Sequence, residues 1–277
     1  MPTSMRAQRL ARRENLLRRR SQILGESAAL DERQILRRAE QIADSISIEA
    51  RLLDFLYQRS RWQPMPRPEW ERWVKVACAV DRLLTTEFRR LPRAKLANLL
   101  DDKSRHEFET FLSAKGRLLL TFHGAFVLIA RRIFIDRDKQ RSDFGRGGNI
   151  NSRRDHRGAL FAALRALQDG QSVVISPDGP DGKLSGVLNL LGTQSPAGEG
   201  AAFLAAASGC KTAWYTVCRT GDTFVPVFEE GPTRAKDESA KQFSDRLYQF
   251  YAAKIEENFT GDPRNIVLRR RWTRLFH

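Results

Sequence analysis

A single histidine ends the most apolar stretch of the sequence. His123 follows the run Leu-Leu-Leu-Thr-Phe at 118–122, and Gly124 separates it from a second apolar run at 125–130. Imidazole titrates near neutral pH, so it is the side chain best suited to take a proton from a hydroxyl or an amine. We therefore expect His123 to be a general base at a strand end, and Gly124 to let the backbone turn before a helix.

A second polar segment also follows an apolar run. The sequence Ser-Pro-Asp-Gly-Pro-Asp-Gly at 176–182 comes directly after the run at 172–175. In an open α/β sheet, ligands bind at the carboxyl ends of the strands, and two strand ends can share one cleft. We expect this loop to face the same cleft as His123.

The other histidines suit chemistry less well. His106 and His156 lie among charged residues in predicted helices, where a solvated side chain is expected, and His277 is the last residue. For His123 the alternative is a hydrogen-bonded core histidine, but its place at a strand end before a glycine favours the catalytic interpretation.

The elements that must position His123 begin near residue 116, where apolar runs of strand length alternate with helical patterns. This alternation predicts an α/β fold with a mostly parallel central sheet flanked by helices. We expect strands at 117–122, 171–176, 211–218 and 223–228, helices at 124–134, 155–169, 198–208 and 237–258, a polar loop at 142–152 and a basic terminal helix. Gly170 is expected to cap the second of these helices.

The chain before residue 116 is predicted to be helical. Its apolar spacing indicates a basic amphipathic segment at 1–30 and helices at 31–60, 69–90, 92–100 and 105–114. Trp62, Trp70 and Trp73 lie beside arginines and could form an interfacial belt, but aromatic residues at helical spacing more often pack in a core. We expect three parts: residues 1–30, a helical region at 31–115 and an α/β domain at 116–277.

The net charge of +15 is concentrated at the two ends of the chain. Residues 1–24 carry seven arginines against one acid, and residues 264–277 carry five arginines and no acid. Such ends suit an anionic partner, which can be nucleic acid, a membrane surface or an acidic carrier protein, and the alternative is a solvated tail. We expect no specific nucleic-acid partner, because the sequence has no zinc-ligand spacing, helix-turn-helix signature or RNA-binding sheet motif.

The cysteines and the hydropathy suggest a compartment. Cys78, Cys210 and Cys218 have no metal-ligand spacing, and their odd number favours no disulfide framework, which indicates a reducing compartment. The basic N-terminus has no apolar segment typical of a secretory signal. The longest apolar run, 118–130, is shorter than the ~20 residues of a membrane-spanning helix. These features predict a cytoplasmic protein.

Several motifs between residues 115 and 275 occur in an order that resembles the lysophospholipid acyltransferase superfamily. They are His-Gly at 123–124, Gly-Ala-Leu at 158–160, Leu-Arg-Ala-Leu-Gln-Asp-Gly at 164–170, Val-Val-Ile-Ser-Pro-Asp-Gly-Pro at 173–180, Leu-Leu-Gly at 190–192 with the Gly-Ala helix to 205, and Asp-Pro-Arg to Arg-Arg-Trp at 262–272. Within the superfamily, the sequence is similar to the bacterial lipid A late acyltransferases and to a bacterial branch with His-Gly and Pro-Asp-Gly-Pro motifs.

The resemblance implies transfer of a fatty acyl group from an acyl thioester to a hydroxyl or amine. The donor would be an acyl carrier protein or coenzyme A, and the acceptor a glycolipid, a lysophospholipid or a secondary metabolite. No metal or other cofactor is required. The arginine-rich ends predict that such an enzyme of lipid metabolism would be peripheral on the inner face of the cell membrane, and its oligomeric state stays open.

A set of candidate substrate-binding residues follows from the chemistry that such a transfer needs. We expect Gly124 and the loop residues Gly179, Pro180 and Gly182 to contact the substrate, with loop N–H groups or an arginine stabilising the oxyanion. Arg131 and Arg132 are candidates to hold a phosphate of a lipid headgroup or of a pantetheine arm, the alternative being a solvated helix end. The apolar residues 187–191, with Phe203 and Leu204, could line an acyl-chain slot, but a sheet–helix core is the favoured interpretation.

One position departs from the superfamily pattern. Most members carry an acid five residues after the histidine, where this sequence has Leu128. The candidates to replace that acid are Asp178, Asp136 and Glu199, and Asp178 is preferred because its loop should open at the same sheet edge as His123. The alternative is a non-catalytic protein that keeps the fold to bind a lipid or a partner.

Overall fold

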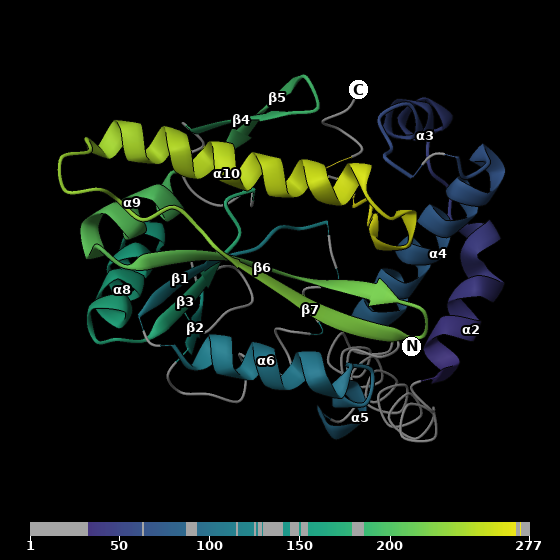
Figure 1. The fold of residues 1–277 in the computed structure, drawn as a ribbon, viewed down its shortest axis with the longest axis horizontal. Helices are drawn as coiled ribbons and strands as arrows, with labels where there is room; N and C mark the ends of the chain where they lie inside the picture. Colours follow the sequence, from purple (N-terminus) through teal and green to yellow (C-terminus); the bar gives the residue numbers. More distant parts are fainter. Residues whose placement is uncertain are drawn as a thin grey trace, which may run out of the picture.

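Most strands of the central sheet are formed by the apolar runs that follow residue 116. The structure is a computed structural model that describes residues 33–62, 64–86, 93–114, 116–124, 126, 129, 141–144, 150, 155–178, 186–269 and 272. The strand order of the sheet is β2-β3-β1-β6-β7 (Figure 1). The strands are β1 (Arg117–Leu120), β2 (Arg141–Asp143), β3 (Ser172–Ile175), β6 (Lys211–Thr220) and β7 (Thr223–Glu230). All neighbouring pairs are parallel except β6 and β7, so the mostly parallel α/β fold is confirmed.

Helices cover both faces of the sheet, because successive strand residues alternate between two apolar cores. Leu118 and Leu120 lie in the core formed with α8 (His156–Gln168), α9 (Gly200–Ser208) and α10 (Ala240–Thr260). Leu119 lies in the opposite core with α2 (Arg33–Ile42), α4 (Arg67–Thr85) and α5 (Arg93–Ala97). In Figure 1, α10 runs along one side of the sheet and α6 (Asp102–Ser113) along the other.

The helical region before the sheet is confirmed, with one correction. The single helix expected at 31–60 is wrong: α2 ends at Ile42, a short 3-10 turn follows at Ala43–Ser45, and α3 begins again at Ala50 and ends at Tyr57. Trp70 is fully buried in the core, Trp73 is partly buried, and Trp62 is 39% exposed beside the Arg264 guanidinium. The core interpretation therefore holds for Trp70 and is wrong for Trp62.

Three strands were not expected. Strand β2 lies at the start of the segment predicted to be a loop. Strands β4 (Gly186–Leu190) and β5 (Thr193–Ala197) pair with each other in a separate antiparallel hairpin, which packs against α10 (Figure 1). The hairpin turn places Leu191 at φ 52° and Gly192 at φ 84°. Gly170 has φ 78° and follows Asp169, the C-cap residue of α8, so it takes the left-handed conformation that commonly ends a helix, in line with its expected capping role.

The basic terminal helix that was expected lies mostly outside the described residues, where only Trp272 of residues 270–277 is placed. Before it, a 3-10 turn spans Pro263–Asn265, and residues 266–269 are irregular. The Val267 N–H donates to the Gly124 carbonyl over 3.3 Å, and the Leu268 N–H contacts the Cys78 sulfur of α4. Arg269 forms an ion pair with Asp81 of α4. The segment therefore joins α4 to the backbone beside His123.

In the described part of the chain, no helix is both long enough and apolar enough to cross a bilayer. The basic segment 1–30 and most of the helix expected at 124–134 lie outside the described residues.

A buried aromatic cluster includes Phe122, the residue directly before His123. Phe122 stacks on Trp214 of β6 and contacts the edges of Phe259 and Trp272, with ring centres 5.4, 5.9 and 6.1 Å away. Trp272 is fully buried, so its side chain holds the terminal segment in the core on which the histidine loop rests.

We expect Trp272→Ala to lower the free energy of unfolding by about 3–5 kcal/mol, since it empties a large buried site. Trp62→Ala is the matched control, because that indole is partly exposed, and it should cost less than about 1 kcal/mol. Urea unfolding measures both. Equal losses in the two variants would contradict the buried role of Trp272.

Candidate functional site

The register between β1 and β3 brings His123 and Asp178 together. Leu120 pairs with Ile175 at the carboxyl ends of these parallel strands, and the Thr121 N–H continues the ladder to the Ile175 carbonyl over 3.1 Å. His123 and Asp178 each lie three residues beyond these paired ends. Equal lengths of chain therefore carry the two side chains to the same point at the sheet edge.

One carboxylate oxygen of Asp178 makes two contacts with His123. Asp178 Oδ2 accepts the His123 backbone N–H over 3.0 Å and lies 3.0 Å from His123 Nδ1. These contacts fix both the backbone and the ring of the histidine against the same oxygen. Of the three acids considered as its partner, the structure thus places Asp178 on the imidazole.

Asp178 is fully buried, yet its pKa is lowered. Burial alone would raise the pKa, because water no longer solvates the charge. The charge of the His123 imidazole, the hydrogen bonds from His123 and Tyr251, and the His123 backbone N–H outweigh that effect. Asp178 is therefore a buried carboxylate that stays ionised near neutral pH.

The ionised acid decides which nitrogen of His123 carries the proton. A carboxylate only accepts hydrogen bonds, so Nδ1 must be the protonated nitrogen and Nε2 the basic one. The His123 side chain is 41% exposed, whereas Asp178 is buried behind it. An exposed base backed by a buried acid can take a proton from a bound substrate.

Tyr251 completes the site from α10, and the sequence analysis missed it. Its hydroxyl lies 2.7 Å from Asp178 Oδ1 and 2.7 Å from the Thr121 carbonyl oxygen. Tyr251 shares one face of α10 with Leu247, Ile255 and Phe259, all of which are buried. A phenol on such an apolar stripe must find a buried hydrogen-bond partner, and this was the available signal.

Position 124 has no room for a side chain, which explains its glycine. A Cβ atom at this position would lie 2.4 Å from the Phe122 ring. The φ angle of Gly124 is not in the left-handed region, so the expected backbone turn is not the reason for the glycine. The close approach of the Phe122 ring is the reason, and Gly124 is buried directly after His123.

The other expected site residues are not all placed. Arg131, Arg132, Gly179, Pro180 and Gly182 lie outside the described residues, as do Leu128 and Asp136. Glu199 is exposed before the first turn of α9. Among the described residues, no cluster of His, Cys, Asp or Glu side chains is arranged to hold a metal ion.

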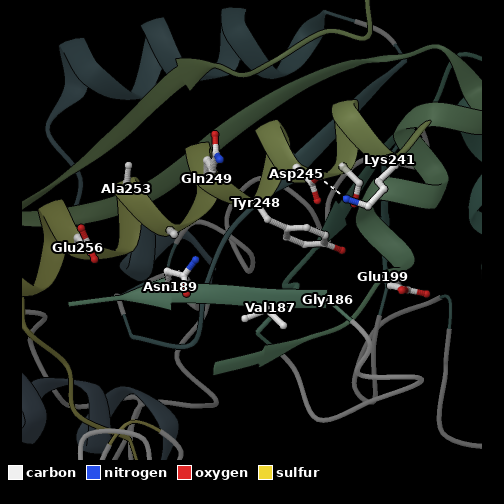
Figure 2. Close-up of a pocket in the computed structure, with 12 residues that line it drawn as sticks. Gly186, Val187, Asn189, Glu199, Lys241, Asp245, Tyr248, Gln249, Ala253 and Glu256 are labelled. Atoms are coloured by element: carbon white, nitrogen blue, oxygen red, sulfur yellow. Dashed lines mark hydrogen bonds and ion pairs between the residues drawn. The ribbon is translucent and has the colours of Figure 1, made fainter. Parts of the chain in front are cut away.

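A surface cavity of about 760 Å³ lies on the other side of α10 from the sheet, against the β4–β5 hairpin (Figure 2). Its lining includes Glu199, Asp245 and Glu256, and Lys241 pairs with Asp245 over 3.1 Å. Neither His123 nor Asp178 lines it. Val187 lines it with 51% exposure and Phe203 of α9 is 44% exposed, so the core expected for these two residues is wrong. Leu188, Leu190 and Leu204 are buried in the core, as expected.

The remaining histidines and the cysteines do not join the site. His106 is exposed, as expected. His156 is half-buried at the start of α8 with its ring edge-on to Phe144, so a fully solvated side chain was the wrong expectation. Cys78, Cys210 and Cys218 are free thiols, and burial raises the pKa of each. Raised pKa values make these thiols poor nucleophiles.

Comparison of the sequence with models of known protein families gives no match, and comparison with curated proteins gives none either.

The lowered pKa of Asp178 predicts how stability depends on pH. A carboxyl whose pKa is lower in the folded state stabilises the fold above its unfolded pKa of about 3.9, and this contribution is lost as the pH falls through the folded pKa. Asp178→Asn should therefore lower the free energy of unfolding by about 1–3 kcal/mol at pH 7, and the difference from wild type should shrink below about pH 4. Urea unfolding from pH 7 to pH 3 measures this. A difference that stays constant over that range would show that the ionised carboxylate does not stabilise the fold.

Proposed function

We propose that this chain is an acyltransferase that moves a fatty acyl group from an acyl thioester to a hydroxyl or amine acceptor, with His123 as general base. The observation that carries the proposal is the exposed His123 imidazole held by the buried Asp178 carboxylate at the carboxyl edge of the sheet. The order of sequence motifs that resembles the lysophospholipid acyltransferase superfamily supports the choice of reaction.

The proposed reaction needs one proton to be moved twice. His123 Nε2 takes the proton of the acceptor hydroxyl or amine as its oxygen or nitrogen attacks the thioester carbon. Asp178 stabilises the imidazolium that forms. The tetrahedral intermediate then breaks its carbon–sulfur bond, and the leaving thiolate takes the proton from His123. The products are an ester or amide and a free thiol.

The oxyanion of the intermediate requires a donor. Backbone N–H groups of residues 179–182, or an arginine, are the candidate donors, because such a reaction needs N–H groups aimed at the developing charge. The donor substrate would be an acyl carrier protein or acyl-coenzyme A, and the acceptor a glycolipid, a lysophospholipid or a secondary metabolite. Mass spectrometry of lipids and small molecules from cells with and without the intact gene would identify the acceptor.

His123→Ala should lower the rate of acyl transfer by about 10²–10⁴, the usual contribution of a general base. His106→Ala is the matched control, because this exposed imidazole lies on α6 and should leave the rate unchanged. The assay measures thiol release and acylated product with both acyl carrier protein and coenzyme A donors. Full turnover by His123→Ala would exclude the histidine mechanism. An inactive wild type that still binds lipid would favour a non-catalytic binding protein.

We also propose that the arginine-rich ends attach the chain to the inner face of the cell membrane. Each basic side chain near an anionic surface contributes about 1 kcal/mol, and salt screens this attraction. The full chain should float with anionic liposomes at low salt, and high salt or deletion of residues 1–24 should release it. Zwitterionic liposomes are the control. A chain that stays unbound from anionic liposomes at low salt would contradict this attachment.

A further inference from the structure

We propose that Tyr251 is a positioning residue of the site, which acts through Asp178 by fixing the carboxylate so that Oδ2 faces His123 Nδ1. The catalytic consequence of this proposal rests on the proposed function, whereas the contact itself does not. Tyr251 is fully buried, and its ring packs edge-on against Trp214 of β6 with centres 5.7 Å apart. A ring held between helix and sheet in this way places its hydroxyl with little freedom.

The two oxygens of Asp178 have different partners. Oδ2 lies against the backbone N–H and the ring of His123, and in the described part of the chain Oδ1 has the Tyr251 hydroxyl. A buried carboxylate oxygen without a donor is costly. Loss of the hydroxyl therefore favours any rotation of the carboxyl group that takes Oδ2 away from His123 Nδ1.

The Tyr251 hydroxyl has one proton and two neighbouring acceptors. Its oxygen is 2.7 Å from Asp178 Oδ1 and 2.7 Å from the Thr121 carbonyl. A hydrogen bond to an ionised acceptor is about twice as strong as one to a neutral acceptor, so the proton is directed to Asp178. The competing role, holding the Thr121 carbonyl and through it the strand before His123, predicts a different pattern of mutant effects.

Helix α10 offers a matched control one turn away. Tyr248 is also buried, and its hydroxyl donates to the Gly198 carbonyl over 2.6 Å, not to Asp178. Each Tyr→Phe change removes one buried hydroxyl from the same helix and keeps the ring. Tyr251→Phe should lower kcat about tenfold with little change in KM, and Tyr248→Phe should change kcat less than twofold.

The decisive measurement repeats Tyr251→Phe in the Asp178→Asn background. If the hydroxyl acts through the carboxylate, its removal from Asp178→Asn should lower kcat less than twofold further, because the charge that it served is already gone. If the hydroxyl acts through the Thr121 carbonyl, the tenfold loss should persist in both backgrounds. That second result would overturn the proposal.

Urea unfolding at pH 7 tests the contact without any assay of turnover. The four proteins compared are wild type, Tyr251→Phe, Asp178→Asn and the double variant. We expect the two substitutions to be coupled by roughly tenfold or more in the unfolding equilibrium constant, as for hydrogen bonds to charged groups. If the two substitutions are coupled but the protein transfers no acyl group, Tyr251 still positions Asp178, and only the proposal of acyltransferase activity is rejected. Additive effects in an active enzyme would reject the Tyr251 proposal alone.

If Asp178→Asn does not fold, the comparison of single and double variants cannot be made, and nitrogen-15 NMR spectra of the histidine rings take its place. The chain has four histidines, and His123→Gln identifies the signals of interest. Tyr251→Phe should change the distribution of the proton between Nδ1 and Nε2 of His123, and Tyr248→Phe should not. Wild-type His123 signals in Tyr251→Phe would overturn the proposal.

Discussion

The site depends on one buried charge. A carboxylate taken out of water costs several kcal/mol unless donors surround it, and Asp178 is fully buried. Its donors come from two places that are distant in sequence: the chain beyond β1, which supplies the backbone N–H and ring of His123, and α10, which supplies Tyr251. The sheet edge and α10 must therefore both be in place before the charge is tolerated. This requirement links the histidine loop, the acid loop and a helix from the last quarter of the chain.

The register between β1 and β3 satisfies this requirement and the packing of the core together. The pairs Leu118 with Val173 and Leu120 with Ile175 point into the same apolar core, and the next alternation carries Phe122 into the aromatic cluster. A slip of one residue would turn these side chains to the other face, and it would also separate His123 from Asp178. The hydrophobic pattern that fixes the register thus fixes the geometry of the base and the acid. The same strand register therefore serves both the packing of the core and the positioning of the site.

The sequence predicted the parts of this arrangement that depend on local pattern. Apolar runs predicted the parallel strands β1, β3 and β6 but not the polar edge strand β2, and the ends of β1 and β3 placed His123 and Asp178 at one edge of the sheet. The β4–β5 hairpin was missed because Leu191 takes a left-handed conformation that is unusual for leucine, so the apolar run hid a turn that only Gly192 signalled. The break between α2 and α3 was missed because the apolar spacing continues across Ala43–Ser45 without proline or glycine. The contact of Tyr251 with Asp178 spans 73 residues and depends on tertiary packing, which local periodicity does not encode.

The segment that supplies the acid determines which parts of the fold hold the His123 ring in place. In most of the superfamily that the sequence resembles, the acid follows the histidine by five residues, so base and acid belong to one short segment. Here that position is Leu128, and the carboxylate at His123 Nδ1 comes from the loop after the neighbouring strand. The pairing is then maintained by the ladder between β1 and β3 and by the donor from α10, not by the segment after the histidine. Substitutions in the strands or on the buried face of α10 should therefore affect the imidazole through Asp178, even where the substituted side chain does not contact His123.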